Sequence, residues 1–336
     1  MRVNNITELS IAIPGDRTIE EYIRLSILID QYGFHTLSIY DDLLFKPAWP
    51  LLSVVASNTE KVRIGPAVVN PYLVHPAITA GNLAVLDEIS QGRAYLGIGK
   101  GAFLDFLNLD SQKPLTALGE ATEIIQSLIR GDRKPYPGKM FSLAESAFLR
   151  YKPVRDRIPI IYGTWGFQTS ELAGQIADGI KASPLWNPDY AIELRNHLAK
   201  GALSTGRDKD SLKLCLGVLT SVDEDEITAK ECAKQSLAVY LPYLSPMTEY
   251  LDVSKEELNK VSPLSKAGRY GDAAMHITDH TLDSFALYGT PAQVSKKIQD
   301  LLNKVSVDRI EFGSPLGPDP VNAITLLGEQ VLPVFR

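Results

Sequence analysis

Two adjacent carboxylates, Asp41 and Asp42, follow directly after the apolar run Thr36–Tyr40. Successive side chains of an extended backbone point to opposite sides, so both carboxylates cannot face one cavity. One arrangement has one carboxylate capping the next element while the other does acid–base or hydrogen-bonding work. In the alternative, both are caps or are solvated. The residues alone do not choose between the two arrangements.

Glycine and prolines interrupt a second apolar run, Ile64–Pro76, which reads IGPAVVNPYLVHP. Glycine and proline at a strand end mark a backbone that leaves regular pairing. The apolar pair Val68-Val69, held in such a segment, can form a wall under a flat ligand. The alternative is an ordinary loop into the next helix, in which His75 has a structural role. On the residues alone, the loop interpretation is favoured.

Two glycine-rich turns follow further along the chain. Gly97–Gly101 (GIGKG) resembles half of a dinucleotide-binding fingerprint, but Ala102 breaks the pattern and no helix follows at once. Its simpler interpretation is a turn that allows close backbone approach. Gly163–Gly166 (GTWG) precedes a predicted helix, where backbone N–H groups and Thr164 can hold a phosphate. A plain strand-to-helix turn is the alternative.

Composition argues against several other functions. No His, Cys, Asp and Glu residues have metal-ligand spacing, and no Ser–His–Asp arrangement can be argued. A net charge of −6 without a basic run argues against nucleic acid as a partner. Cys215 and Cys232 are expected to be buried thiols in a reducing compartment. No signal-peptide core or membrane-length apolar run is evident, so a soluble, cytoplasmic protein is expected.

Short apolar runs alternate with helical patterns along the 336 residues, a normal length for one α/β barrel. Strands are predicted at Leu9–Pro14, Thr36–Tyr40, Val62–Ile64, Ala94–Ile98, Ile158–Tyr162, Asp178–Ala182, Leu212–Ser221 and Arg309–Phe312. The alternation predicts parallel strands joined by crossover helices. A doubly wound sheet is the competitor, but eight strands ending in glycine or polar residues favour a (β/α)8 TIM barrel. Residues 1–336 are expected to form one domain with insertions near 131–157 and 241–286.

In such a barrel, the site lies at the carboxyl ends of the strands. This rule brings five segments together: Asp41-Asp42, Ala67–Asn70, Gly97–Gly101, Gly163–Gly166 and Gly313–Asp319.

Motifs spread from residue 9 to residue 335 resemble those of the bacterial luciferase-like oxidoreductases, which use flavin or coenzyme F420. Within that superfamily the chain is most similar to the F420-dependent 5,10-methylenetetrahydromethanopterin reductases. The motifs are IGPAVVNPYLVHP (64–76), LDEISQGRAYLGIGKG (86–101), YGTWG (162–166), IADGI (176–180), GSPLGPD (313–319) and LLGEQVLPVF (326–335).

The resemblance implies a barrel with insertions, bound F420 (or FMN, in other branches), hydride transfer at the ring's C5, and a non-prolyl cis peptide at Ala67–Val68. It also implies a homodimer or higher homo-oligomer. The cofactor-binding residues that it implies are Asp41, Ala67, Val68, Val69, Asn70, Gly99, Gly163, Thr164, Trp165 and Gly166.

Three positions depart from the reductase pattern. Ala12 and Ala102 stand where the reductases usually carry acids, and Asp42 stands where they carry histidine. The prediction is therefore F420-dependent hydride transfer to or from the C1 unit of methylene-tetrahydromethanopterin or a related pterin, with Asp42 as proton donor or polar orienter. The alternatives are an FMN-dependent monooxygenase or reductase, and a non-catalytic barrel that binds F420 or a pterin.

Overall fold

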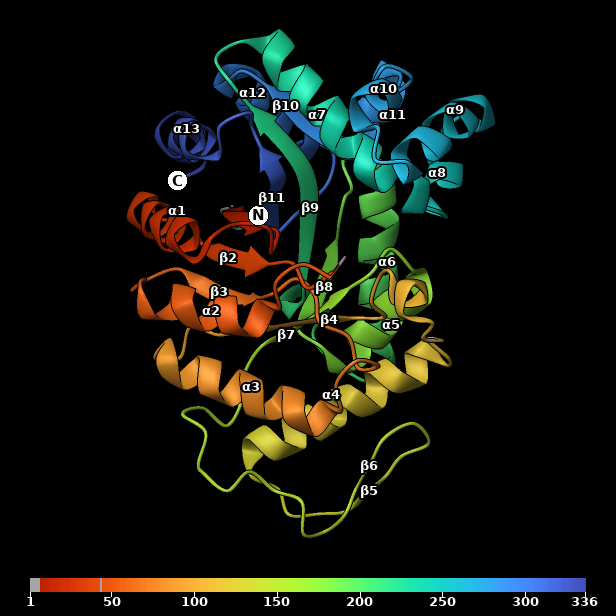
Figure 1. The fold of residues 1–336 in the computed structure, drawn as a ribbon. Helices are drawn as coiled ribbons and strands as arrows, with labels where there is room; N and C mark the ends of the chain where they lie inside the picture. Colours follow the sequence, from red (N-terminus) through yellow and green to blue (C-terminus); the bar gives the residue numbers. More distant parts are fainter. Residues whose placement is uncertain (1–6, 43) are drawn as a thin grey trace. The chain divides into compact units, whose positions relative to one another are not determined.

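The computed structural model describes residues 7–42 and 44–336. Its mainly parallel strands alternate with helices along the chain (Figure 1), which confirms the predicted TIM-barrel fold. The strands are β1 (Glu8–Ile13), β2 (Thr36–Ile39), β3 (Arg63–Pro66), β4 (Leu96–Gly99), β5 (Tyr136–Pro137), β6 (Ser142–Leu143), β7 (Ile160–Gly163), β8 (Gly179–Ala182), β9 (Lys213–Val222), β10 (Ala286–Gly289) and β11 (Arg309–Leu316). The helices are α1 (Ile19–Tyr32), α2 (Ala48–Ser57), α3 (Pro76–Ile89), α4 (Pro114–Arg130), α5 (Phe167–Ile176), α6 (Pro188–Ser204), α7 (Glu226–Tyr240), α8 (Met247–Tyr250), α9 (Lys255–Lys266), α10 (Tyr270–Ala274), α11 (Asp279–Phe285), α12 (Pro291–Leu302) and α13 (Pro320–Leu326).

The described residues form two compact units. The N-terminal unit contains Ala12–Lys181 and Glu193–Leu214, and the C-terminal unit contains 7–11, Ala182–Ile192 and Cys215–Arg336. In the N-terminal unit, β2 pairs with β3, and β4 pairs with β7, which pairs with β8. Two isolated bridges, Ile64–Ala94 and Val69–Ile98, link the β3 segment to β4. In the C-terminal unit, β11 lies between β1 and β9.

Local signals in the sequence set several helix ends. Thr18 and Thr290 form capping boxes with Glu21 and Gln293, so the side chains satisfy backbone N–H groups that have no partner inside the helix. Helix α1 ends at Gly33, which has a φ of 76° and adopts the left-handed conformation that glycine tolerates best.

One strand was missed by the sequence patterns. β10 pairs in parallel with β9 at the end of the segment predicted as an insertion, residues 241–286. All of its residues are buried, so it lacks the alternation of polar and apolar residues that marks a half-exposed strand. The last α-helix, α13, ends at Leu326 and continues as a π-helical turn at Leu327–Val331.

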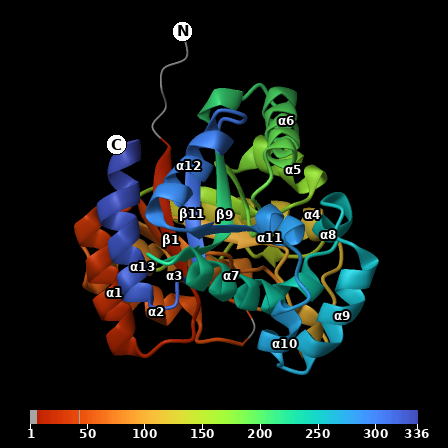
Figure 2. The same cartoon turned by 90° about the horizontal axis from the view of Figure 1, so that it is seen from above.

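The two predicted insertions have internal structure. In the N-terminal unit the β5–β6 hairpin is held by Glu120 of α4, whose carboxylate accepts N–H groups of Lys139, Met140 and Phe141 at 2.6, 2.7 and 2.9 Å. In the C-terminal unit α9, α10 and α11 pack against α7 (Figure 2). Buried Glu257 of α9 accepts hydrogen bonds from the Thr278 N–H and the Thr281 hydroxyl, which tie α9 to α11.

The LDEISQGR motif serves the fold. Asp87 is fully buried and forms an ion pair with Arg155, whose guanidinium also donates to the Ala94 carbonyl at 2.7 Å. Arg93 donates to the carbonyls of Ala56 and Val62, which connects the start of β4 to the α2–β3 turn. Both contacts lie at the amino end of β4, the end of the strands that supports stability in this fold.

Candidate functional site

Four of the five predicted site segments belong to the N-terminal unit, where they follow β2, β3, β4 and β7. Gly313–Asp319 belongs to the C-terminal unit. The site is described below from the N-terminal unit.

The peptide bond between Ala67 and Val68 is cis, as predicted. The segment is held on both sides: the Ala67 N–H donates to the Ile39 carbonyl of β2 at 2.8 Å, and the Val69 N–H donates to the Gly97 carbonyl of β4 at 3.0 Å. Ala67 and Val68 stay partly exposed, whereas Val69 is buried. The cis peptide is therefore the part of this segment that a ligand can touch.

The Val68 side chain packs against three glycines, at positions where any larger residue would come too close to it. A Cβ added at Gly163 would lie 2.8 and 2.9 Å from the two Val68 methyl groups. A Cβ at Gly99 would lie 2.9 Å from one of them, and a Cβ at Gly97 would lie 3.1 Å from the other and overlap the Pro66 carbonyl oxygen. The simpler interpretation of Gly97–Gly101, close backbone approach, is confirmed. Cofactor contact by Gly99 and Gly163 stays a prediction.

The end of the β3 segment is fixed by polar side chains. Asn70 is buried, and its Oδ1 accepts the Tyr72 and Leu73 N–H groups, both at 3.0 Å. The Nδ1 atom of His75 accepts the Ala77 N–H at 3.2 Å, so His75 caps α3 in the structural role that was favoured for it. Asn70 thus has a structural role of its own, and its predicted cofactor contact would have to use its Nδ2 group.

Asp41 caps the next element, as one arrangement predicted, and the acid–base role of Asp42 stays a prediction. Asp41 Oδ1 accepts the Ala48 N–H at 3.0 Å at the start of α2, where Pro47 provides no side-chain cap. Asp42 Oδ1 is buried and has no hydrogen-bond partner within the described part of the chain. Burial, and next the charge of Asp41, raise the pKa of Asp42 to about 6, against the opposing effect of Lys181. A carboxyl with such a pKa exchanges protons near neutral pH.

Lys181 is a candidate site residue that the sequence patterns missed. It lies on β8 with only 7% of its surface exposed, and its Nζ lies 5.8 Å from the centroid of the Tyr40 ring. Lysine is rarely this buried unless its charge is paired with other groups. The only available signal was a lysine inside the apolar run GIKA.

The turn after β7 supplies a cradle of polar groups. Thr164 Oγ1 accepts the Gly166 N–H at 2.8 Å, and its own N–H donates to the Lys181 carbonyl. A Cβ at Gly166 would lie 3.5 Å from the Thr164 hydroxyl and 3.6 Å from the Thr169 hydroxyl, so both hydroxyls border this glycine. Among the residues described, no side chain caps α5 at Gly166. An uncapped helix start beside two hydroxyls suits an anion. Trp165 lies half-buried in the same turn.

The three departures are placed as follows. Ala12 is buried in β1, and Ala102 is exposed after β4. Neither position carries an acidic side chain. Of the three positions, only Asp42, which lies after the carboxyl end of β2, has a carboxylate.

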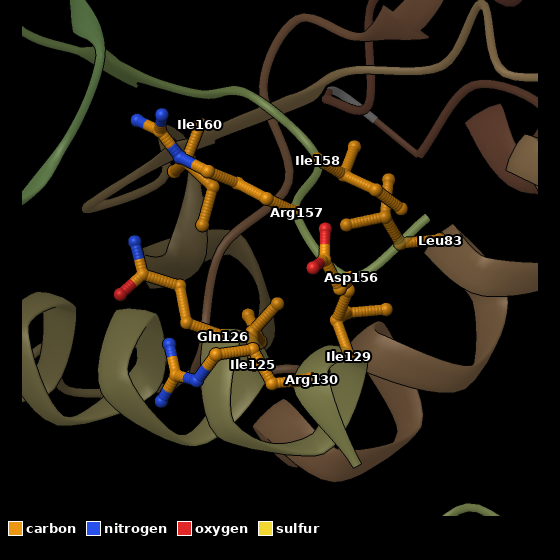
Figure 3. A pocket seen from close by; sticks show the side chains of 9 residues that line it. All are labelled: Leu83, Ile125, Gln126, Ile129, Arg130, Asp156, Arg157, Ile158 and Ile160. Atoms are coloured by element: carbon orange, nitrogen blue, oxygen red, sulfur yellow. The ribbon is translucent and has the colours of Figure 1, made fainter. Parts of the chain in front are cut away.

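Two hollows lie away from these residues. A cavity of about 120 Å³ between α3, α4 and the start of β7 (Figure 3) has Arg130 and Arg157 at its rim, which pair with Asp132 and Asp178. A wider groove lies between α2 and α3. Neither is lined by a predicted site residue.

Over the described ranges no group of three or more His, Cys, Asp and Glu side chains is arranged to hold a metal. None of the helices described has the length and apolar character needed to cross a membrane.

Comparison with known proteins was made at the level of sequence and of fold. The 5,10-methylenetetrahydromethanopterin reductase of Archaeoglobus fulgidus is 32% identical over 325 residues, covering 95% of this chain and 96% of that protein. The F420-dependent glucose-6-phosphate dehydrogenase of Microbacterium testaceum is 25% identical, covering 94% and 93%. The solved coenzyme F420 dependent tetrahydromethanopterin reductase of Methanopyrus kandleri has a TM-score of 0.90 at 28% identity, covering 98% of this chain and 100% of that one.

The family model of the luciferase-like monooxygenases matches residues 6–309. This match spans most of the chain, and the reductase of Archaeoglobus fulgidus exceeds 30% identity over nearly its whole length. The chain therefore belongs to the luciferase-like monooxygenase family.

Proposed function

We propose that this protein is an F420-dependent oxidoreductase that transfers hydride between the cofactor and the C1 unit of methylene-tetrahydromethanopterin or a related reduced pterin. The observation that carries the proposal is the partly exposed Ala67–Val68 segment, whose Val68 side chain packs against three glycines. Relatives that share the whole length of the chain are reductases of this kind by name.

The residues present fit such a cofactor. Ala67 and Val68 offer a partly exposed, apolar surface for one face of a flat ring. Thr164, Thr169 and the uncapped start of α5 offer donors for a phosphate. When bound, F420 would supply the hydride-carrying carbon, and the protein's part would be orientation and electrostatics.

Asp42 is proposed as the proton donor. Hydride adds to the carbon of the methylene unit while the bond from that carbon to one pterin nitrogen breaks, and that nitrogen takes up a proton. A carboxyl with a pKa of about 6 is about half protonated at pH 6 and about one tenth protonated at pH 7, and this protonated fraction can supply the proton. Asp41 is excluded from this role in the proposal because its Oδ1 is used by the Ala48 N–H.

The proposal is tested by titrating the purified protein with F420 and, separately, with FMN, followed by absorbance. Binding of F420 and oxidation of reduced F420 by a methylene-pterin would support it. FMN uptake without F420 binding would replace it with a flavin enzyme of the same fold. Tight F420 binding without turnover on any donor or acceptor would replace it with a binding barrel.

The predicted anion cradle can be tested by removing its hydroxyls. The double variant Thr164→Val, Thr169→Val is expected to weaken F420 binding about tenfold, because hydrogen bonds to a charged group contribute about 1.5 kcal/mol or more. Affinity for the deazaflavin core without its phosphate tail should stay unchanged. Thr205→Val is a matched control, since that hydroxyl donates to the Ala202 carbonyl. Equal losses for both ligands would contradict a phosphate cradle.

We also propose that the chain forms a homodimer through α2 and α3. The groove between them, about 510 Å³, is lined by Trp49, Pro50, Ser53, Ala77, Ile78, Gly81, Asn82, Val85, Leu149 and Tyr151. Ile78 and Val85 are 59% and 44% exposed, and such apolar patches mark interfaces. Light scattering should give about twice the 36.9 kDa chain mass. Val85→Lys should give monomers, whereas Ile227→Lys, at an exposed site on α7, should not. A monomeric wild-type protein would end this proposal.

A further inference from the structure

Lys181 occupies an unusual position for a cationic side chain. It lies within β8 between Ile180 and Ala182, both fully buried, and is itself almost completely buried. Its backbone is fixed, because its carbonyl accepts the Thr164 N–H at 2.9 Å. Burying an ammonium group is unfavourable unless nearby groups compensate. The groups around its ammonium group therefore decide how this buried charge is stabilised and which groups it acts on.

The side chain of Lys181 on β8 extends to Tyr40, a residue that follows the distant strand β2. In the hydrogen-bonded order of the N-terminal unit, β3, β4 and β7 lie between β2 and β8. The Lys181 Nζ nevertheless lies 5.8 Å from the ring centroid of Tyr40, the residue that follows β2. In a barrel, side chains of well-separated strands meet only by pointing into the interior. Lys181 therefore projects inward, toward the carboxyl end of β2.

Asp42, two residues after Tyr40, is the carboxyl group on which this charge acts. Two factors raise the pKa of Asp42: burial and the neighbouring Asp41 carboxylate. Lys181 is the cation that opposes them. Of the other charged groups on the adjoining loops, Lys46 is exposed, and Asp16 and Arg17 face each other at 3.9 Å.

We propose that Lys181 is a positioning residue whose buried charge keeps Asp42 able both to ionise and to take up a proton near neutral pH. Without this cation, burial and Asp41 would shift Asp42 further toward its protonated form at neutral pH. The consequence for catalysis rests on the proposed function, because it takes Asp42 as the proton donor. The electrostatic coupling between Lys181 and Asp42 does not.

The coupling can be measured on the full chain without any cofactor. The side-chain carboxyl carbons of 13C-labelled aspartate are followed by NMR as the pH is changed, and the Asp42 signal is assigned by its loss in Asp42→Asn. Lys181→Met should raise the apparent pKa of that signal by about one unit, as expected for removal of a nearby opposite charge. Lys46→Met, which removes an exposed cation from the adjoining loop, should leave it within about 0.3 units. An unchanged pKa in Lys181→Met would overturn the proposal.

Two further variants keep the test decisive. Lys181→Gln has a stem of similar shape and replaces Lys181→Met if circular dichroism shows that the latter is unfolded. Lys181→Arg retains the charge and should restore the wild-type pKa, which a purely structural role for the lysine stem would not predict. If the protein turns over a substrate, the limb of the kcat/KM profile that reports Asp42 should shift to higher pH in Lys181→Met by the same amount. A failure of F420 to bind would remove the proposed function but leave the NMR result intact.

Discussion

Asp42→Asn is expected to stabilise the protein at neutral pH while removing most of its turnover. The pKa of Asp42 is raised from an ordinary 3.8 to about 6, first by burial. A carboxyl with a raised folded-state pKa contributes stability that is fully present below about pH 4 and is lost as the pH rises through about 6. Asparagine does not ionise, so it avoids this loss. A shift of about two units corresponds to roughly 3 kcal/mol, which is an upper bound for the gain.

The measurement is urea unfolding of both proteins at pH 4 and pH 7.5. The advantage of Asp42→Asn should grow between these two values and level off above pH 7. Asp41→Ala is the matched control, since Asp41 caps α2 through the Ala48 N–H and alanine has no acceptor for it. Loss of that cap should destabilise the protein by about 1 kcal/mol. An advantage for Asp42→Asn that is the same at both pH values would show that the Asp42 pKa is not raised.

Turnover should fall by roughly 10²- to 10³-fold in Asp42→Asn, the range for loss of a general acid, while the Kd for F420 changes less than about twofold. This separation matters because a structural carboxylate would affect binding and turnover together. Turnover at the wild-type rate would mean that another group donates the proton. A variant both more stable and less active would show that folding stability is sacrificed at this site for function.

Gly163→Ala is expected to disturb the cis Ala67–Val68 segment through direct overlap. The new Cβ would meet the two Val68 methyl groups at 2.8 and 2.9 Å, closer than real Cβ contacts occur. Overpacking of this kind costs about 1–3 kcal/mol, and it should also weaken ligand binding because Val68 must move. Urea unfolding and F420 titration measure the two effects.

Val68→Ala should rescue Gly163→Ala. Removing the two methyl groups leaves the Val68 Cβ, at 3.4 Å from the new atom, as its nearest neighbour, so the double variant should be less destabilised than the sum of the singles by about 1–2 kcal/mol. Gly97→Ala is not expected to be rescued, because its Cβ would also overlap the Pro66 carbonyl oxygen. Gly119→Ala, with nothing within 4 Å in helix α4, should be neutral or slightly stabilising. Strict additivity of Gly163→Ala and Val68→Ala would contradict the contact.

Much of the fold follows from local patterns. The eight predicted strands lie close to their predicted bounds, because each apolar run is flanked by glycines, prolines or polar residues that act within a few residues. β10 was missed because it starts at Ala286 directly after α11 ends at Phe285, so no turn residue separates its short apolar run from the preceding segment. The position of the cis peptide was predicted from motif resemblance and not from the physics of the segment.

By itself the sequence determined the parallel α/β architecture and a candidate site at the strand ends, because the spacing of apolar residues, glycines and prolines acts within one or two turns of chain. The tertiary structure was needed to identify the contacts between side chains of distant segments. It showed that Gly97, Gly99 and Gly163 accommodate Val68, and that Lys181 faces Tyr40 near Asp42. These partners lie roughly 30 to 140 residues apart. Local sequence patterns do not determine which inward-pointing side chains contact one another inside a barrel.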